Sequence, residues 1–302
     1  MAPLPTITSQ DGPKITLNAY LKDPLLVPTV TVQMMDQGFL ADAILRHVGQ
    51  ADAGVVRYSE STPIYADSTV RVRAEMAEVP IAQGSMGQPN STYTSDRSLS
   101  VVITDEDKRR SNIDKLNVRM MQVKNSIIQA WDQAFVAAVT GNPSVNTFTA
   151  SGVWSGASYD IRNDILSAAK LIDTATDAQG SQFGFEADVL IVNKNTKYDI
   201  LRSNQFQTPY VGDIASENLK YTGVLPQKLL NFDVVTVPTT ILATGTAILL
   251  QRNVSGFIAD EVPLNATALY RDEPRKLWRS DVQRVSAVGL DQPKSVTLIT
   301  GI

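Results

Sequence analysis

The chain has 302 residues, of which 43% are hydrophobic and 19% charged, a composition that predicts a folded globular protein. Its formal net charge of -4 excludes a strongly basic nucleic-acid binder, so any contact with nucleic acid should be weak or confined to one face. There are no cysteines and only one histidine, His47. This composition excludes disulfides and cysteine nucleophiles and argues against a zinc site.

The sequence also lacks the common signatures of enzymes and of membrane proteins. Neither GxxxxGK[ST] nor GxGxxG occurs, and no GxSxG motif presents a nucleophilic serine. The N-terminus has no signal-peptide pattern, and no apolar run approaches the roughly 20 residues of a transmembrane helix. We therefore predict no catalytic, cofactor-binding or metal-binding residues and no membrane partner.

The first predicted element is an extended N-terminal arm. Five prolines lie within the first 30 residues, and their spacing predicts extended chain rather than a helix. Residues 38–48 follow with the apolar spacing of a short helix.

A long β-hairpin is predicted next. Apolar and charged residues alternate from Val70 to Met76, and a return run places Leu99, Val101 and Ile103 on one face. Gly and Pro residues between the two runs predict a flexible tip. Because an isolated two-stranded hairpin is marginally stable in water, this hairpin must find its packing partner elsewhere.

A very long helix is predicted after the hairpin. Ser111 and Asp114 resemble a capping box, and the pattern stops at Gly141. The helix entry, 105–110, reads DEDKRR, which fits either a solvated junction or salt bridges between chains. The apolar positions with helical spacing are Ile113, Leu116, Met120, Val123, Ile127, Ala130, Ala134 and Ala138, widened by Trp131 and Phe135.

The second half of the chain alternates between helices and strands. A helix over 159–175 is predicted to bury Ile161, Ile165, Ala168, Leu171 and Ile172. An apolar strand at 187–193 precedes a helix capped by Asn195. Further strands are predicted at 232–238 and 246–252, and alternating strands, broken by GLDQP, close the chain.

The order of these elements resembles the major capsid protein of tailed bacteriophages, the Hong Kong-phage type of capsid fold, and more distantly the bacterial encapsulins. Four stretches carry the resemblance: AEVPIAQG in the extended loop, NSIIQAWDQAFVAAVTGN at the end of the spine helix, ADVLIVNKNTKYDILRSNQ, and the strands of LLNFDVVTVPTTILATGTAILLQRNVSGFIADE. At NFDVV the sequence departs from the Gly-x-Pro-Val pattern of many relatives.

The resemblance implies an α+β phage major capsid fold with five parts. These are an N-terminal arm and short helix (1–55), an extended β-hairpin loop (56–104), a peripheral domain with the spine helix (105–154), an axial domain (155–270), and C-terminal strands that return to the peripheral domain (271–302). The candidates for contacts between subunits are Arg71, Arg73, Glu75, Glu78, Gln83, Gln88, Arg97, Asp105, Glu106, Arg109 and Arg110. The candidates for packing of the spine helix are Ile113, Leu116, Met120, Ile127, Trp131 and Phe135.

The function that the resemblance implies is structural. Hexamers and pentamers of this chain would form an icosahedral virion shell, assembled in the host bacterial cytoplasm, around double-stranded DNA that the shell contacts weakly. The implied partners are a portal, a separate scaffolding protein and a decoration protein. Two alternatives stay open: an encapsulin-like nanocompartment that encloses enzyme cargo, and a two-domain α/β enzyme.

Overall fold

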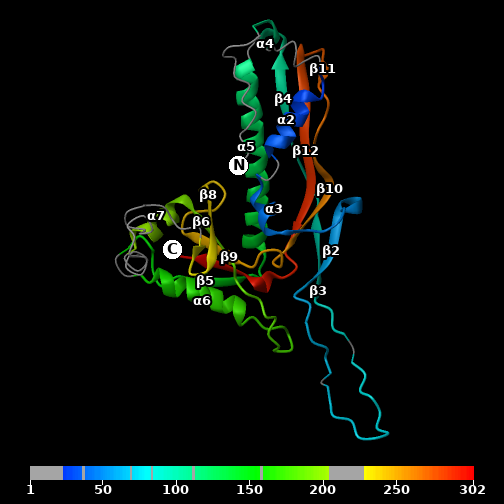
Figure 1. Cartoon of the computed structure of the whole chain (residues 1–302), viewed down its shortest axis with the longest axis vertical. Coiled ribbons are helices and arrows are strands. Elements are labelled where there is room, and N and C mark those ends of the chain that lie inside the picture. The colour runs from blue at the N-terminus through cyan, green and yellow to red at the C-terminus, as the bar shows by residue number, and fades with distance from the viewer. Residues whose placement is uncertain are drawn as a thin grey trace.

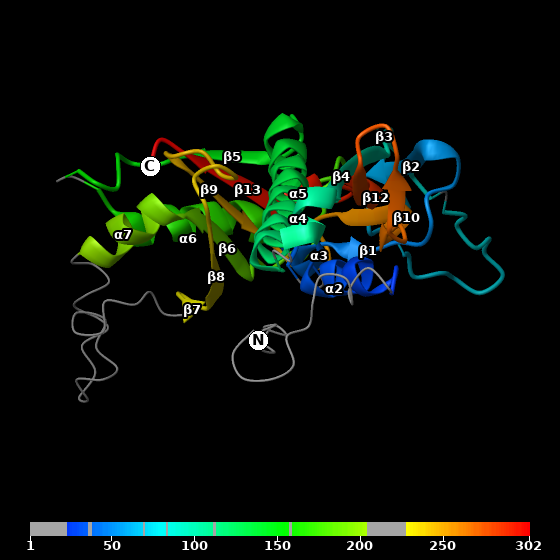
Figure 2. The same cartoon turned by 90° about the horizontal axis from the view of Figure 1, so that it is seen from above.

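The computed structural model describes residues 23–35, 38–68, 70–82, 84–110, 113–156, 159–203 and 228–302. Within these residues the chain forms two packed bodies, each built on a β-sheet, and an arm that extends away from both (Figure 1). Figure 2 shows the long helix α5 between the two bodies. The combination of helices and strands predicted from the sequence, an α+β architecture, is confirmed.

Helix α5 spans Ile113–Gly141 and has 29 residues, which makes it about 44 Å long. It follows the short helix α4, Asp105–Arg110. The prediction of one long helix that ends at Gly141 is therefore confirmed. Ser111, the first residue of the predicted capping box, lies outside the described residues.

The first sheet has β12 (Leu277–Gly289) at its centre. This strand lies between β4 (Ser95–Thr104) and β10 (Phe257–Ala266). It also pairs with β11 (Tyr270–Asp272), while β1 (Arg46–His47) pairs in parallel with β10. Helix α5 packs along this sheet together with α2, Leu26–Met35. Their shared core includes Leu116, Met120, Val123, Ile127 and Trp131 from α5, with Ile113 packed at its edge.

The second sheet is mixed and has six strands. Its central strand, β6, is buried along its whole length, because helices or other elements cover both faces. In spatial order the strands are β5 (Asn146–Thr149), β13 (Val296–Thr300), β9 (Thr246–Leu250), β6 (Val189–Asn193), β8 (Phe232–Val237) and β7 (Lys228–Leu229).

Helix α5 contributes to the cores of both bodies. One face of the second sheet packs against α6 (Ile161–Asp173) and α7 (Lys194–Arg202). The other face packs against α3 (Leu40–Ile44) and against Phe135, Val136 and Val139 at the end of α5. The two bodies are therefore tied together by one continuous helix, and separating them would expose part of its apolar face.

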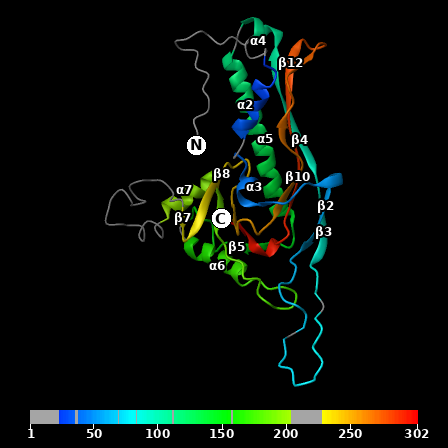
Figure 3. The ribbon, with the colours of Figure 1, turned by 45° about the vertical axis from the view of Figure 1, so that its right-hand side comes forward.

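The arm begins and ends in a two-stranded ribbon. Strand β2 (Val55–Glu60) follows the one-turn 3-10 helix Asp52–Gly54 and pairs with β3 (Gln88–Tyr93). Between these strands residues 61–87 run out and back without regular strand pairing in their described part (Figure 3). A second one-turn 3-10 helix, Pro293–Ser295, precedes β13.

The predicted pairing inside the hairpin is wrong. Residues 70–76 form no strand, and the return run in β4 pairs with β12, where Val101 lies opposite Ser280. Alternation indicates two different faces, but it does not identify the strand that supplies the hydrogen-bonding partner. The loop itself, which leaves after β2 and returns at β3, is present as a long extension.

The N-terminal elements also differ from their prediction. Part of the region expected to be extended forms α2, because Pro28 is the third residue of this helix, where a missing N–H removes no intrahelical bond. Residues 1–22 lie outside the described residues. The helix expected over 38–48 is limited to α3, since Arg46 and His47 instead pair with β10.

Three smaller differences concern the cap of α7, the buried face of α6 and the position of the last strand. The side chain that caps α7 is Asn193, which accepts a hydrogen bond from the Thr196 N–H, so the predicted Asn195 cap is wrong. On α6, Leu171 is exposed while the other four predicted positions are buried. The last strand, β13, lies in the six-stranded sheet, although 271–302 was expected to return to the peripheral domain. The other domain boundaries stay predictions.

Candidate assembly surface

The arm exposes an unusual amount of apolar surface. Val70, Val72 and Met76 are each at least 97% exposed, more than any other large hydrophobic side chains of the described residues. The whole set has at least 57% exposure: Ile64, Tyr65, Val70, Val72, Met76, Val79, Ile81 and Met86. Monomeric proteins rarely expose a contiguous apolar patch of this kind unless another surface covers it.

Few hydrogen bonds hold the arm in shape. The Ser68 hydroxyl donates to the Ile81 carbonyl at 3.1 Å, and the Arg73 guanidinium donates to the Ala77 carbonyl at 3.0 Å. On the return limb, close to the root, the Gln179 side chain donates to the Ser85 hydroxyl at 3.0 Å. These contacts are exposed, so each stabilises the arm only weakly.

The root of the arm is held more firmly. Glu60, the last residue of β2, is buried, and its carboxylate accepts hydrogen bonds from Asn142 at 2.6 Å and Ser144 at 3.4 Å. One residue further, the Ser61 N–H donates to the Asp291 carbonyl at 2.9 Å. The arm is therefore anchored both to the loop after α5 and to the loop after β12.

Gly87 allows the two limbs of the arm to approach each other closely. A Cβ atom at this position would lie 2.0 Å from the Glu60 carbonyl oxygen and 2.9 Å from the Thr62 nitrogen. Only glycine fits such a close backbone contact. At Gly84, on the same return limb, this test finds no atom within 4 Å. The arm turns at residues 74–77, so the Gly- and Pro-containing segment predicted as its tip belongs to the return limb instead.

Charged and aromatic side chains surround the root. Arg46 forms an ion pair with the carboxylate of Asp291, yet burial of this carboxyl raises its pKa. The pKa of the Tyr58 hydroxyl is also raised, first by burial and then by the charges of Glu60 and Asp291. Tyr58 packs edge-on against Phe257, with ring centroids 5.1 Å apart. The root is thus a partly buried, electrostatically coupled cluster.

The predicted contact residues fall into two groups. The exposed ones on the arm are Arg71, Arg73, Glu75 and Glu78, and Gln88 is exposed at the start of β3. Gln83 lies outside the described residues. The arm residues share one surface, but their contacts with another subunit stay a prediction.

The other predicted contact residues lie on the first sheet and on α4. Arg97 donates to the Ala130 carbonyl at 2.7 Å and stacks over Trp131, so its described contacts hold β4 against α5. Asp105 accepts two hydrogen bonds from Arg271, which lower the pKa of that carboxyl. Glu106, Arg109 and Arg110 are exposed on α4. Their contact role also stays a prediction.

Sequence reasoning missed several buried charged residues. Asp107 in α4 is buried and accepts hydrogen bonds from Lys115 at 2.8 Å, Arg119 at 2.6 Å and Thr104 at 2.7 Å. Burial acts to raise its pKa, but these partners hold the pKa well below its usual range. Arg284, on the buried face of β12, and Glu60 at the arm root were missed too. No local pattern marked these residues, because their partners come from distant segments.

The described residues contain neither a candidate metal site nor a helix that could span a membrane. There, no three His, Asp or Glu side chains group in a way that could hold a metal ion. Nor does any helix in this part of the chain combine the length and apolar character that crossing a bilayer requires. His47 is about half exposed and lies 3.8 Å from Asp42.

Comparison with solved structures shows a shared fold. The virus-like particle from Pyrococcus furiosus matches with a TM-score of 0.60 and 8% identity, covering 90% of this chain and 97% of that chain. The structure of Microbacterium phage Oxtober96 matches with a TM-score of 0.61 and 14% identity, covering 87% and 91%. The mature capsid of bacteriophage PhiM1 matches with a TM-score of 0.54 and 12% identity, covering 87% and 86%.

Comparison by sequence gives the family. No curated protein matches the chain. The family described as phage capsid protein matches residues 90–297, which run from β3 through α5 and most strands of both sheets to the start of β13. The chain therefore belongs to the phage capsid protein family, and its role is that of a structural protein of a capsid shell.

Proposed function

We propose that the chain is the major capsid protein of a tailed phage and assembles into hexamers and pentamers of an icosahedral shell around double-stranded DNA. The role is structural and not enzymatic, and assembly takes place in the host bacterial cytoplasm. The observation that carries the proposal is the arm, which extends beyond both bodies and leaves its apolar side chains exposed (Figures 1 and 3).

The energetics of the arm favour association. Full burial of one aliphatic side chain gains about 1.5–3 kcal/mol. Several such side chains from each arm, repeated around a ring of subunits, would supply the driving force for assembly. Charges of both signs on the arm would set the register of the contact more than its affinity.

The test is an arm replacement that keeps the root. Residues 65–86 are replaced by a short Gly-Ser linker, so that β2 and β3 can still pair. We expect a soluble subunit with an unchanged unfolding midpoint that forms no shells in electron micrographs, whereas the unmodified chain forms shells. Normal shells from the replacement variant would contradict the role of the arm.

We further propose that the shell is not covalently cross-linked. Some capsids of this fold join a loop lysine to an asparagine of a neighbour, but residues 74–96 contain no lysine. Boiled particles should therefore migrate near the monomer mass of 32.8 kDa on a denaturing gel. A ladder of covalent multimers would disprove this expectation.

Separate proteins are proposed to complete the particle. We propose a separate scaffolding protein, because the resemblance to tailed-phage capsid proteins implies one. A portal and a decoration protein complete the proposed set. Co-expression with candidate scaffolds should increase the fraction of closed shells of uniform size, and uniform closed shells from this chain alone would contradict a required scaffold.

An encapsulin-like compartment is the second candidate. The fold is shared with the virus-like particle from Pyrococcus furiosus as well as with phage capsids, so it fits both proposals. Particles from the native source distinguish the two proposals, because a phage capsid should contain double-stranded DNA and a compartment should contain a co-purifying enzyme.

A further inference from the structure

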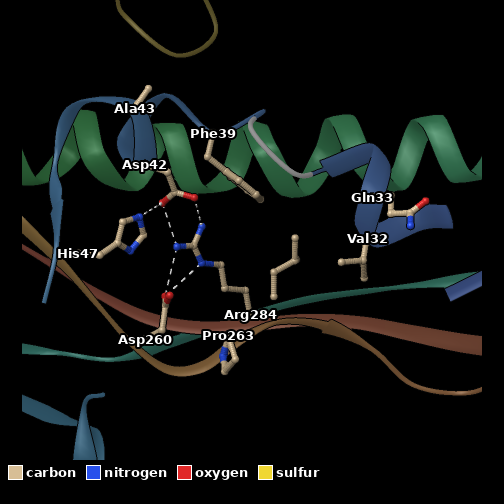
Figure 4. Close-up of a pocket in the computed structure, with 10 residues that line it drawn as sticks. Val32, Gln33, Phe39, Asp42, Ala43, His47, Asp260, Pro263 and Arg284 are labelled. Atoms are coloured by element: carbon tan, nitrogen blue, oxygen red, sulfur yellow. Dashed lines mark hydrogen bonds and ion pairs between the residues drawn. The ribbon is translucent and has the colours of Figure 1, made fainter. Parts of the chain in front are cut away.

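A pocket of about 590 Å³ lies on the first body, between α2, α3 and β10 (Figure 4). Val32 of α2, Phe39 before α3, and Pro263 and Leu264 of β10 supply its apolar walls. Its volume is within the range of pockets that bind small groups or side chains. Gln33 and His47 lie at the exposed side of the pocket.

Three charged residues meet in this pocket. The guanidinium of Arg284 donates to both carboxylate oxygens of Asp42, at 2.8 and 2.9 Å, and to Asp260 at 3.2 Å. It also stacks against the ring of Phe39, 4.9 Å from the centroid. All these groups are labelled in Figure 4, where Arg284 points between the two carboxylates.

The charges in the pocket do not cancel. Two carboxylates, Asp42 and Asp260, face one guanidinium, which leaves one negative charge when His47 is neutral. Arg284 is 5% exposed, so this excess lies next to a partly dehydrated network where charge interactions are stronger than in water. The pocket therefore suits a cation flanked by apolar groups.

The arm offers such a group. Val70 and Val72 alternate with Arg71 and Arg73, and all four side chains are exposed. Arginine is well suited to bind the two carboxylates of the pocket, because its planar guanidinium binds a carboxylate with two parallel hydrogen bonds. The arm extends beyond the end of the sheet, away from α2 and α3, so it does not lie near the pocket of its own subunit (Figures 1 and 3).

We propose that residues 70–73 of one subunit dock in the pocket between α2, α3 and β10 of a neighbouring subunit. An arginine of the segment meets Asp42 and Asp260, and a valine packs against the wall formed by Phe39 and Leu264. This inference rests on the proposed assembly into a shell. It adds the partner surface of the arm, which the family membership does not specify.

Cross-linking tests the docking directly, because the chain has no cysteine of its own. Val72→Cys and Gln33→Cys are combined in one chain, and assembled shells are treated with a short bismaleimide. This reagent joins two cysteines over a wider range of distances and orientations than a disulfide bond allows. Both positions are exposed, so the substitutions should leave folding unchanged.

We expect the double variant to convert most chains into covalent multimers on a denaturing gel. Each single variant should stay monomeric, and so should the double variant when its subunits are dilute and unassembled. The matched control combines Val72→Cys with Val118→Cys, an exposed position on α5, and should stay monomeric. Shells that form normally but cross-link only in this control, or in neither pair, overturn the docking. Absence of shells from the unmodified chain, both alone and with co-expressed candidate scaffolds, would instead overturn the proposed function.

Charge substitutions provide a second test that does not alter the pocket. Arg71→Glu combined with Arg73→Glu should reduce the yield of shells at least tenfold and abolish cross-linking. Arg71→Lys combined with Arg73→Lys keeps the charge and should retain most of the yield. Equal assembly by the glutamate and lysine variants would overturn the role of the arginines, and equal cross-linking would overturn the docking.

Discussion

Asp132 provides the sharpest test of how burial of a charge between α5 and α3 affects stability. Its carboxylate lies on α5, is 5% exposed, and accepts a hydrogen bond from the Leu40 N–H at the start of α3 at 2.9 Å. Burial raises the pKa of this carboxyl to about 6, and the nearby charge of Asp42 contributes to the rise. The backbone hydrogen bonds from Leu40 and Ala41 act in the opposite direction but do not cancel the rise. We predict that Asp132→Asn stabilises the subunit at neutral pH.

The magnitude follows from the pKa. The difference between about 6 and the ordinary value of 3.8 corresponds to about 3 kcal/mol at 1.36 kcal/mol per pH unit. Between about pH 4 and 6 the unfolded chain has released this proton while the folded chain keeps it. The contribution of Asp132 to the free energy of unfolding therefore falls as pH rises through this window, and stays low above it.

Asparagine keeps the acceptor oxygen for the Leu40 N–H and removes the buried charge. We expect a gain of about 1–3 kcal/mol at about pH 7.5 and no gain at about pH 4, measured by urea unfolding of unassembled subunits. Titrating groups that do not interact with Asp132 cancel in the difference between variant and parent. Asp160→Asn, at the exposed cap of α6, controls for the substitution itself. A variant less stable than the parent at pH 7.5, or a difference independent of pH, would refute the reasoning.

Three further predictions follow from local geometry. Gly87→Ala should cost about 1–3 kcal/mol and lower the yield of shells, because its Cβ would meet backbone atoms, while Gly84→Ala should match the parent in both unfolding and electron microscopy. Asp107→Asn should lower the free energy of unfolding by about 1.5–3 kcal/mol at neutral pH. Because the pKa of the native carboxyl is lowered, this loss should shrink as pH falls towards the acid range, and a loss independent of pH would contradict the prediction. Ile165→Ala should cost about 2–5 kcal/mol by thermal or urea unfolding, whereas Leu166→Ala, its exposed neighbour on α6, should change stability by less than about 0.5 kcal/mol; similar losses would show that burial is misassigned.

The elements that the sequence predicted best are those with strong local patterns. The 3.6-residue period of α5 continues over eight turns, and no other regular structure buries those positions together. The continuous apolar run of β6 and the alternating pattern of β12 indicate strands just as clearly. Pro28 misled the prediction because proline is tolerated in the first turn of a helix, and sequence spacing alone does not show where the helix starts.

The assembly surface was predictable only in part. Exposure of the arm followed from its alternating pattern and its lack of a second layer. The anchoring of Glu60 by Asn142, and the pairing of Arg284 with Asp42, join residues far apart in the chain. In the sequence, a buried arginine on a strand looks the same as one that faces solvent. The burial of Arg284 and its pairing with Asp42 therefore could not be predicted from the sequence.

The sequence by itself determined the type and order of the elements, because helix and strand periodicity, glycine stops and proline positions are local properties. Only the tertiary structure decided which strands pair, and here β4 pairs with β12 rather than with residues 70–76. It also decided that α5 serves both cores and that Arg284 meets two carboxylates. Such contacts depend on which distant segments meet, and the free energy that selects them comes from burying the whole set together.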